Sequence, residues 1–193
     1  MRLLFLDFDG VISTYEKKWM LDESKIEILR RIVDETGARI VVTSSWKVGC
    51  KNVGRFRELL GKRGAGKAEW SDGALSWLAG SIYDITDNRG GHRGGQVQRW
   101  LDAHNDDVES YVILDDDDDF SESQLFNFVQ TDIYEGLTER EAKLCIRILK
   151  GERVVNPIRL NLVLTTMWRN NCSGVESSNI RDMLKEYYGK FTQ

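Results

Sequence analysis

Three short apolar runs in this sequence end abruptly in polar residues, and this pattern limits the folds that the chain can adopt. The first run, Leu3 to Leu6, ends in Asp7. Residues 40–42 precede Thr43, and residues 111–114 precede a stretch of five consecutive aspartates. Apolar runs of this length are typical of strands that are buried on both faces. The sequence therefore predicts three buried strands, each followed by polar side chains.

Helical periodicity separates the predicted strands. Apolar residues recur at helical spacing after the first strand, with Asp22 or Ser24 as the N-cap and Gly37 as the stop. A second amphipathic pattern starts after the glycines at 94–95, and a capping box introduces a third helix over 139–150. Alternating strands and helices predict an α/β fold with a parallel sheet and helices on both of its faces.

The predicted core occupies residues 1–150, and residues 151–193 follow it as a C-terminal extension. The extension contains the only proline, Pro157, and its apolar residues from 158 to 167 fit either strand or helical spacing. Residues 180–187 suggest a terminal helix.

The polar clusters that follow the strands are the main functional signal. In parallel sheets, ligands bind beyond the carboxyl ends of the strands, so these clusters are expected to meet at one edge. Carboxylates that lie close together repel one another unless a cation joins them, and an all-oxygen set suits Mg²⁺. Hydroxyl groups and a cation, Arg93 or His92, supply what a phosphoryl group needs.

At these clusters the sequence resembles the haloacid dehalogenase-like (HAD) superfamily of phosphohydrolases. Asp7-Phe8-Asp9-Gly10-Val11-Ile12 resembles its first motif, residues 41–44 its second, and residues 112–116, which end in paired acids, its fourth. The resemblance covers about residues 1–150. It implies a three-layer α/β/α, Rossmann-like core with a central, mostly parallel sheet. Only about 50 residues separate the second motif from Arg93, so a minimal cap and an open site are expected.

Three further segments resemble a HAD subgroup that occurs in RNA-repair (Swiss Army Knife) proteins. They are residues 44–47, 93–101 and 136–138, which correspond to SSWR, RGxEIxxWL and GLT elements. Lys47 replaces the arginine of the first element, and Gln96 with Val97 replaces Glu-Ile in the second.

The resemblance assigns roles to particular residues. Asp7 would be the nucleophile that forms an aspartyl-phosphate, and Asp9 would be the general acid and base. Phosphate binding falls to Arg93 and to the hydroxyl of Thr43 or Ser44, a choice that the sequence leaves open. The resemblance also implies Mg²⁺ as the cofactor. Its ligands would be Asp7, the backbone carbonyl of Asp9, Asp115 and Asp116. Asp117 and Asp118 are expected to be solvated, while the role of Asp119 is open.

Three functions remain open at this point. The preferred one is a phosphatase for a nucleic-acid end, such as a 3′-phosphate on RNA or DNA, or for a nucleotide. Residues 46–70 carry seven Lys or Arg against two Glu, which fits backbone contacts as well as a solvated helix face. The alternatives are a phosphatase for a small metabolite and a non-catalytic module that binds nucleic acid or a repair partner.

Location is predicted from what the sequence lacks. No apolar run approaches the roughly 18–20 residues that a membrane span needs, and three cysteines without CxxC spacing suggest neither disulfides nor zinc. A cytoplasmic protein without a membrane partner is expected, and its oligomeric state is left open. The net charge of −4 does not exclude an anionic substrate, because a bound cation would offset part of the acidic charge.

Overall fold

The computed structural model describes residues 1–17, 20–64, 72–104, 107–152 and 154. Met1–Val154 forms one compact unit. The patterns noted for 158–167 and 180–187 lie outside the described residues. The helices and strands are β1 (Arg2–Leu6), α1 (Glu23–Thr36), β2 (Arg39–Val42), η1 (Ser45–Lys47), α2 (Val53–Gly64), α3 (Asp72–Ser81), β3 (Ile82–Ile85), α4 (Arg93–Ala103), β4 (Ser110–Asp115), η3 (Glu122–Asn127), β5 (Phe128–Gln130) and α5 (Glu139–Leu149).

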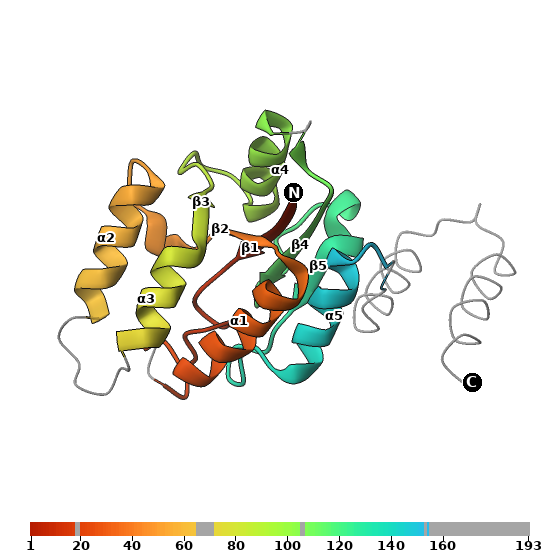
Figure 1. Ribbon diagram of the computed structural model, residues 1–193. Coiled ribbons are helices and arrows are strands. Elements are labelled where there is room, and N and C mark those ends of the chain that lie inside the picture. The colour runs from red at the N-terminus through yellow and green to blue at the C-terminus, as the bar shows by residue number, and fades with distance from the viewer. Residues whose placement is uncertain (18–19, 65–71, 105–106, 153, 155–193) are drawn as a thin grey trace, which may run out of the picture. The chain divides into compact units, whose positions relative to one another are not determined.

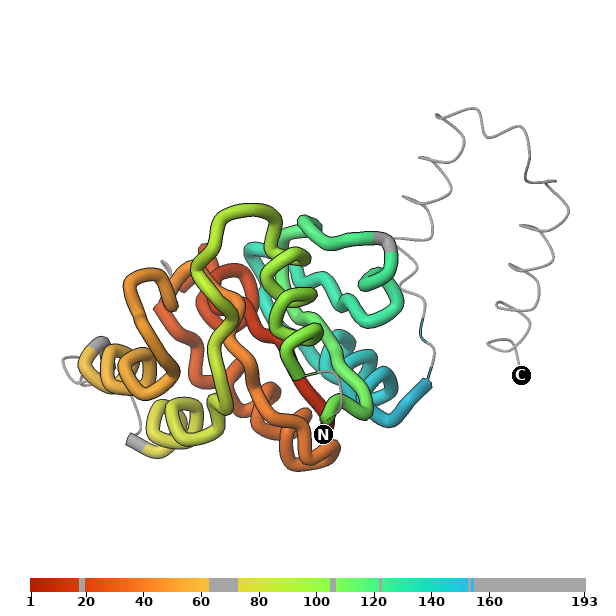
Figure 2. Tube along the Cα trace, turned by 90° about the horizontal axis from the view of Figure 1, so that it is seen from above, coloured from red at the N-terminus to blue at the C-terminus, as the bar shows by residue number. Residues whose placement is uncertain are grey.

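The strands form one five-stranded sheet in the order β3-β2-β1-β4-β5, and all of its neighbouring pairs are parallel. Helix α4 lies on one side of the sheet, and α1 and α5 lie on the other (Figure 1). Seen from above, α4 lies in front of the sheet (Figure 2). The predicted three-layer α/β/α core with a central parallel sheet is confirmed.

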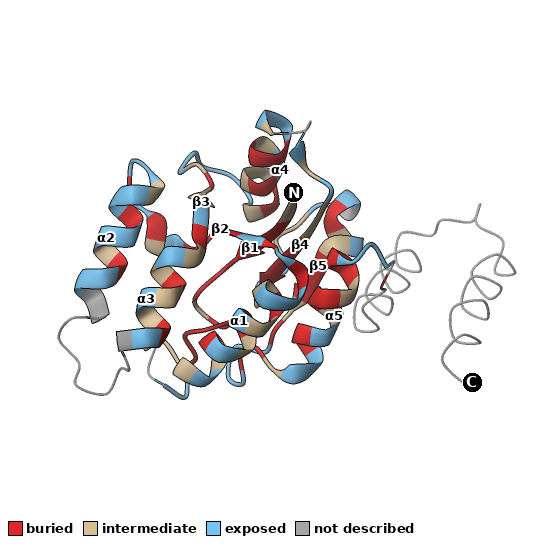
Figure 3. Cartoon of the chain, viewed as in Figure 1, coloured by how far each residue is buried: buried red, intermediate tan, exposed pale blue. Residues whose placement is uncertain are grey.

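Side chains of the central strand alternate between two cores. Leu4 and Leu6 belong to the larger one, which includes residues of α1, α2, α3 and α5. Leu3 and Phe5 belong to the smaller one, which includes Val97, a residue of α4. These four apolar residues of β1 are fully buried, as expected for a strand covered on both faces. Buried residues concentrate in the sheet and on the inward faces of the helices (Figure 3).

The local signals in the sequence act where they were expected. The side chain of Asp22 caps α1, and Gly37 ends it in the left-handed conformation with φ of 67°. Thr138 and Glu141 form the capping box of α5. Helix α4 begins at Arg93, so the glycines at 94–95 lie inside its first turn rather than before it.

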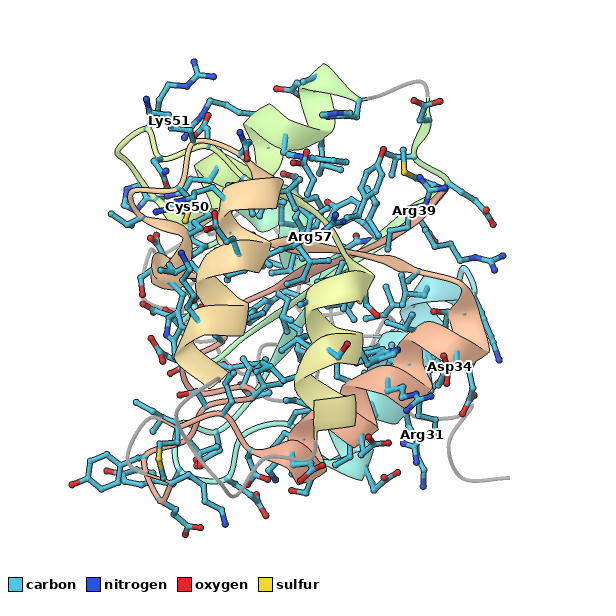
Figure 4. All side chains as sticks on the ribbon, turned by 60° about the vertical axis from the view of Figure 1, so that its left-hand side comes forward. Arg31, Asp34, Arg39, Cys50, Lys51 and Arg57 are labelled. Carbon is cyan, nitrogen blue, oxygen red and sulfur yellow. The ribbon has the colours of Figure 1, made fainter. Side chains whose placement is uncertain are left out.

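Helices α2 and α3 occupy the interval between β2 and β3, where the sequence leaves room for only a minimal cap. They pack on each other and on the larger core through buried residues that include Phe56, Leu60 and Leu78. Arg57 of α2 donates a hydrogen bond of 3.1 Å from Nε to the carbonyl of Ile82, at the start of β3 (Figure 4). The described parts of these helices therefore belong to the same helical layer as α1 and α5. No helix among the described residues combines the length and apolarity needed to cross a membrane.

Candidate active site

The register of the sheet brings the ends of β1, β2 and β4 to one level. Leu6 pairs with Val42 on one side and with Leu114 on the other. Hydrogen bonds continue one residue further, because the Asp7 amide donates to Leu114 at 3.0 Å and the Thr43 amide donates to Leu6 at 2.9 Å. The polar residues that follow these strands therefore lie together at the carboxyl edge of the sheet.

Three carboxylates gather at this edge. Single oxygens of Asp7, Asp115 and Asp116 all lie within 4.8 Å of one another. Asp7 and Asp115 are buried, and Asp116 is half-buried. Gly10 makes room for them: its φ is +70°, and a Cβ at this position would lie 2.2 Å from Cγ of Asp116. A glycine is therefore required both by the turn and by the space that Asp116 occupies.

The burial and crowding of these acids raise their pKa values. Burial, and then the negative charge of Asp7, raise the pKa of Asp116 to about 6. The same two causes raise the pKa of Asp115. Burial also raises the pKa of Asp7, although Arg93 and a hydrogen bond from Ser44 lower it. The buried acids therefore favour the approach of positive charge, either as protons or as a cation.

Arg93 is the cation that faces the cluster. Its Nη1 atom lies 2.9 Å from Oδ2 of Asp7 and 3.3 Å from Oδ2 of Asp115. The same atom donates a hydrogen bond of 3.1 Å to the backbone carbonyl of Thr43. Since Arg93 is the first residue of α4, this helix carries the guanidinium to the acids. His92 lies beside it, but its side chain is 86% exposed.

The two candidate hydroxyls have different surroundings. Oγ1 of Thr43 is buried and has no hydrogen-bond partner among the described residues. The Ser44 hydroxyl donates to Asp7 and accepts a hydrogen bond of 3.3 Å from the amide of Trp46. A buried hydroxyl without a hydrogen-bond partner is uncommon. This geometry favours Thr43 over Ser44 as the hydroxyl that could bind a phosphoryl oxygen.

The Asp9 side chain is outside the three-acid cluster. Its Oδ1 atom accepts a hydrogen bond of 2.9 Å from the indole Nε1 of Trp46 and one of 3.3 Å from the Ser13 hydroxyl. Asp7 and Asp9 therefore diverge after the strand ends, as the turn at Gly10 requires. In the sequence, Trp46 belongs to the 44–47 element that resembles SSWR and to the basic stretch 46–70, and neither pattern predicts its contact with Asp9. Its position shortly after a strand end is the signal that places it near the site.

The donor set fits Mg²⁺. The three acids offer only carboxylate oxygens, which this hard ion prefers. Oδ2 of Asp115 is buried and accepts no hydrogen bond in the described part of the chain, even though Arg93 lies near it. A buried carboxylate oxygen in that state is costly unless a cation binds it. Asp7, Asp115 and Asp116 are the side chains that could hold the metal.

A comparison with protein-family models gives one match, over residues 3–142, to the family described as the HAD domain in Swiss Army Knife RNA repair proteins. The chain belongs to this family. Comparisons with curated proteins and with solved structures gave no match. The predicted membership of the HAD superfamily and of its RNA-repair subgroup is confirmed, and the family indicates a phosphohydrolase of the HAD type.

Lys47 takes the place of the arginine in the SSWR element of this HAD subgroup. It is only 2% exposed. Its Nζ atom donates to the Asp87 carbonyl at 3.0 Å, to Oδ1 of Asn88 at 3.3 Å and to Oε1 of Gln96 at 3.0 Å. The lysine thus ties η1 to the segment after β3 and to α4, the helix that carries Arg93. The sequence pointed to this position only through the resemblance.

Asp119, whose role the sequence left open, supports the first turn of α4. Its Oδ2 atom accepts a hydrogen bond of 3.1 Å from the Arg93 amide, and its Oδ1 atom lies 2.6 Å from Nδ1 of His92. Asp117 and Asp118 are exposed. Of the five consecutive aspartates in this HAD domain, the first two face the site and the fifth positions the helix that bears Arg93.

Proposed function

We propose that this HAD domain is a Mg²⁺-dependent phosphatase that works through an aspartyl-phosphate on Asp7. The observation that supports it most directly is the convergence of three carboxylates, one guanidinium and one unpartnered hydroxyl at the carboxyl edge of the sheet. Mg²⁺, held by Asp7, Asp115, Asp116 and the backbone carbonyl of Asp9, would supply positive charge that offsets repulsion between the carboxylates and the phosphoryl oxygens.

In the first step, a carboxylate oxygen of Asp7 bonds to phosphorus while the bond from phosphorus to the leaving oxygen breaks. Asp9 gives its proton to that leaving oxygen. Trp46 and Ser13 hold Oδ1 of Asp9, and this fixes the orientation of the carboxyl group. Oδ2 is then the atom that carries the proton.

In the second step, Asp9 accepts a proton from water and the water oxygen attacks phosphorus. The bond between phosphorus and Asp7 breaks, inorganic phosphate leaves, and both aspartates return to their starting state. Arg93 and Thr43 bind the phosphoryl oxygens, whose charge they stabilise in both steps. Arg93 would exchange part of its contact with Asp7 for the substrate.

A nucleic-acid end, such as a 3′-phosphate, or a nucleotide is the proposed substrate. The family is described by its occurrence in RNA-repair proteins, and the helices between β2 and β3 pack on the core. An open site of this kind admits a polymer end as well as a small molecule. The alternative is a phosphatase for a small metabolite. A comparison of hydrolysis rates between the two kinds of substrate decides between them.

The chemistry is tested by Asp7→Asn, which keeps the size of the side chain but removes the nucleophile. We expect Mg²⁺-dependent phosphate release from an aryl phosphate by the wild type and none above background by Asp7→Asn. Asp118→Asn, an exposed acid of the same stretch, serves as the matched control and should keep full activity. Equal activity of Asp7→Asn and wild type would exclude the mechanism.

The substrate class is tested by a panel on the wild type. Oligonucleotides with a 3′-phosphate or a 5′-phosphate, nucleoside monophosphates and sugar phosphates are compared by kcat/KM. We expect one of the nucleic-acid substrates to be hydrolysed best. A preference for sugar phosphates would instead support the small-metabolite alternative and leave the proposed chemistry intact.

A further inference from the structure

A concave region lies beside the end of β3 and the segment that follows this strand. It has a volume of about 780 Å³ and is lined by the turn before α2, the segment that follows β3, and α4. We call it the β3 groove. Its volume lies in the range of sites that bind small molecules or single nucleotide units.

The β3 groove carries an excess of positive charge. Its lining includes Lys51, Arg89 and Arg99 against two acids, Asp84 and Asp87. Both acids already have partners. Oδ2 of Asp84 accepts from Trp100 Nε1 at 2.7 Å, and the two oxygens of Asp87 accept from Arg99 at 2.8 and 2.9 Å.

Two of these cations face solvent. Arg89 makes one ion pair, of 2.9 Å with Asp87, yet its side chain is 76% exposed. Lys51 is exposed on the turn that precedes α2 (Figure 4) and makes no ion pair with the described residues. Both are therefore available to an anionic ligand that enters the β3 groove.

Buried Lys47 links the β3 groove to the helix that carries Arg93, because it donates hydrogen bonds to Asn88 of the groove and to Gln96 of α4. Asn88 in turn donates a hydrogen bond of 3.3 Å to the carbonyl of Cys50, which joins the two sides of the groove. Arg93, at the start of the same helix, reaches the acids. The groove and the acid cluster are therefore connected through Lys47 and α4.

We propose that the β3 groove binds the backbone of a single-stranded nucleic acid whose terminal phosphate lies at Asp7, with Lys51 and Arg89 contacting the phosphodiesters that follow. This inference rests on the proposed phosphatase function and adds a binding site for the polymer. On this proposal, a small phosphate ester bound at Asp7 makes no contact with either cation. The two cations therefore distinguish a nucleic-acid end from a small ester.

The test uses the full chain with Lys51→Ala and Arg89→Ala combined. Its matched control combines Lys143→Ala and Lys150→Ala, which remove the same charge from exposed positions at α5. Binding of a fluorescent 3′-phosphorylated oligonucleotide is measured by anisotropy, and KM and kcat are measured for that oligonucleotide and for an aryl phosphate.

We expect the groove variant to bind the oligonucleotide about tenfold more weakly, with a salt dependence whose slope falls by about 2, one for each lost phosphate contact. KM for the oligonucleotide should rise by a similar factor, while KM and kcat for the aryl phosphate stay within about twofold of wild type. The α5 control should behave as wild type in every assay.

Unchanged oligonucleotide binding in the groove variant would overturn the proposal, as would an equal loss in the α5 control. A parallel rise of KM for the aryl phosphate would also overturn it, because the cations would then act on the reaction centre. The anisotropy arm does not need turnover. If the wild type hydrolyses no phosphate ester, the proposed function fails, but binding still decides the role of the groove.

Discussion

Three carboxylates that share a largely buried space can stay together only if protons or a cation reduce their charge. The raised pKa values of Asp7, Asp115 and Asp116 all have burial as their main cause. Arg93 offsets only part of this charge. At the scale of residues, the cluster is therefore a site whose stability depends on what binds there.

This dependence leads to a prediction for Asp116→Asn. The substitution removes one of three repelling charges, so the metal-free variant should be more stable than the metal-free wild type. Its response to Mg²⁺ should be lost, whereas a ligand at 100 times its Kd stabilises the wild type by about 2.7 kcal/mol. Thermal unfolding with EDTA and with Mg²⁺ measures both effects, and Asp118→Asn is the control. An equal rise in Tm with Mg²⁺ in Asp116→Asn would contradict the assignment.

Lys47 gives a second prediction at this scale. Burial, followed by the charge of Arg93, lowers its pKa to about 8, while a lysine in an unfolded chain titrates near 10.4. Between these values the unfolded state carries more protons, so the free energy of unfolding rises with pH by up to about 1.4 kcal/mol per unit. Urea unfolding of wild type and Lys47→Met should therefore diverge between pH 8 and 10 but run parallel between pH 6 and 7. Parallel curves throughout would show that Lys47 titrates normally.

Individual site residues could be predicted where the motif sits on a strand end. Asp7 and Thr43 follow strands and Asp115 ends one, and the register of these strands brings the three residues together. A preference between Thr43 and Ser44 needs the tertiary structure, because it depends on which hydroxyl already makes hydrogen bonds. The contacts of Lys47 and Asp119 join segments that are distant in sequence. Such contacts cannot be predicted from a local sequence pattern. Their roles, like those of all the site residues, stay proposals.

At the scale of elements, α4 connects the sheet to the reaction centre. The N-cap residue His92 makes no side-chain capping bond. Asp119 instead accepts a hydrogen bond from the Arg93 amide and so caps the first turn of α4. The Gly94 amide also donates a hydrogen bond of 2.9 Å to the carbonyl of Asp119. A Cβ on Gly94 would lie 2.6 Å from Gln124 Oε1 and 2.9 Å from Phe120 Cα. The first turn of α4 is therefore held closely against the segment that follows β4.

We expect Asp119→Ala to lower the free energy of unfolding by about 1 kcal/mol, the usual cost of a lost cap. The variant should also lower kcat, because the cap fixes the turn from which Arg93 reaches Asp7. Asp119→Asn keeps an acceptor oxygen and should recover most of both losses. Urea unfolding and phosphate release measure the two effects. A wild-type kcat in Asp119→Ala would contradict the prediction, because it would show that the Asp119 cap does not affect the position of Arg93.

Elements with a clear apolar period were predicted from the sequence, whereas α3 and the two edge strands were not. The three central strands, together with α1, α4 and α5, carry clear periodicity and caps, and the structure contains them all. The sequence analysis missed β3 and β5, which are the edge strands. β3 has four residues, half of them only partly buried, and β5 has three residues. Such short segments take their conformation from the neighbouring strand and have little pattern of their own.

At the scale of the whole molecule, the end of the HAD domain is the open question. The boundary predicted at residue 150 stays a prediction. The position of Val154 indicates where the boundary could lie instead. Val154 is 5% exposed and belongs to the larger core. Arg147 of α5 pairs with Glu152 at 2.6 Å. These contacts lead us to propose that the folding unit extends to Val154.

Chains that end at residue 150 and at residue 154 test this proposal. All five strands and both cores lie within Met1–Val154, so the longer chain should unfold cooperatively in urea. The shorter one should lose about 1.5 kcal/mol, the lower end of what burying a valine contributes. Val154→Ala in the longer chain separates the side chain from the added length and should account for a large part of the loss. Equal stability of the two truncated chains would place the boundary at 150, because Val154 would then contribute nothing to the core.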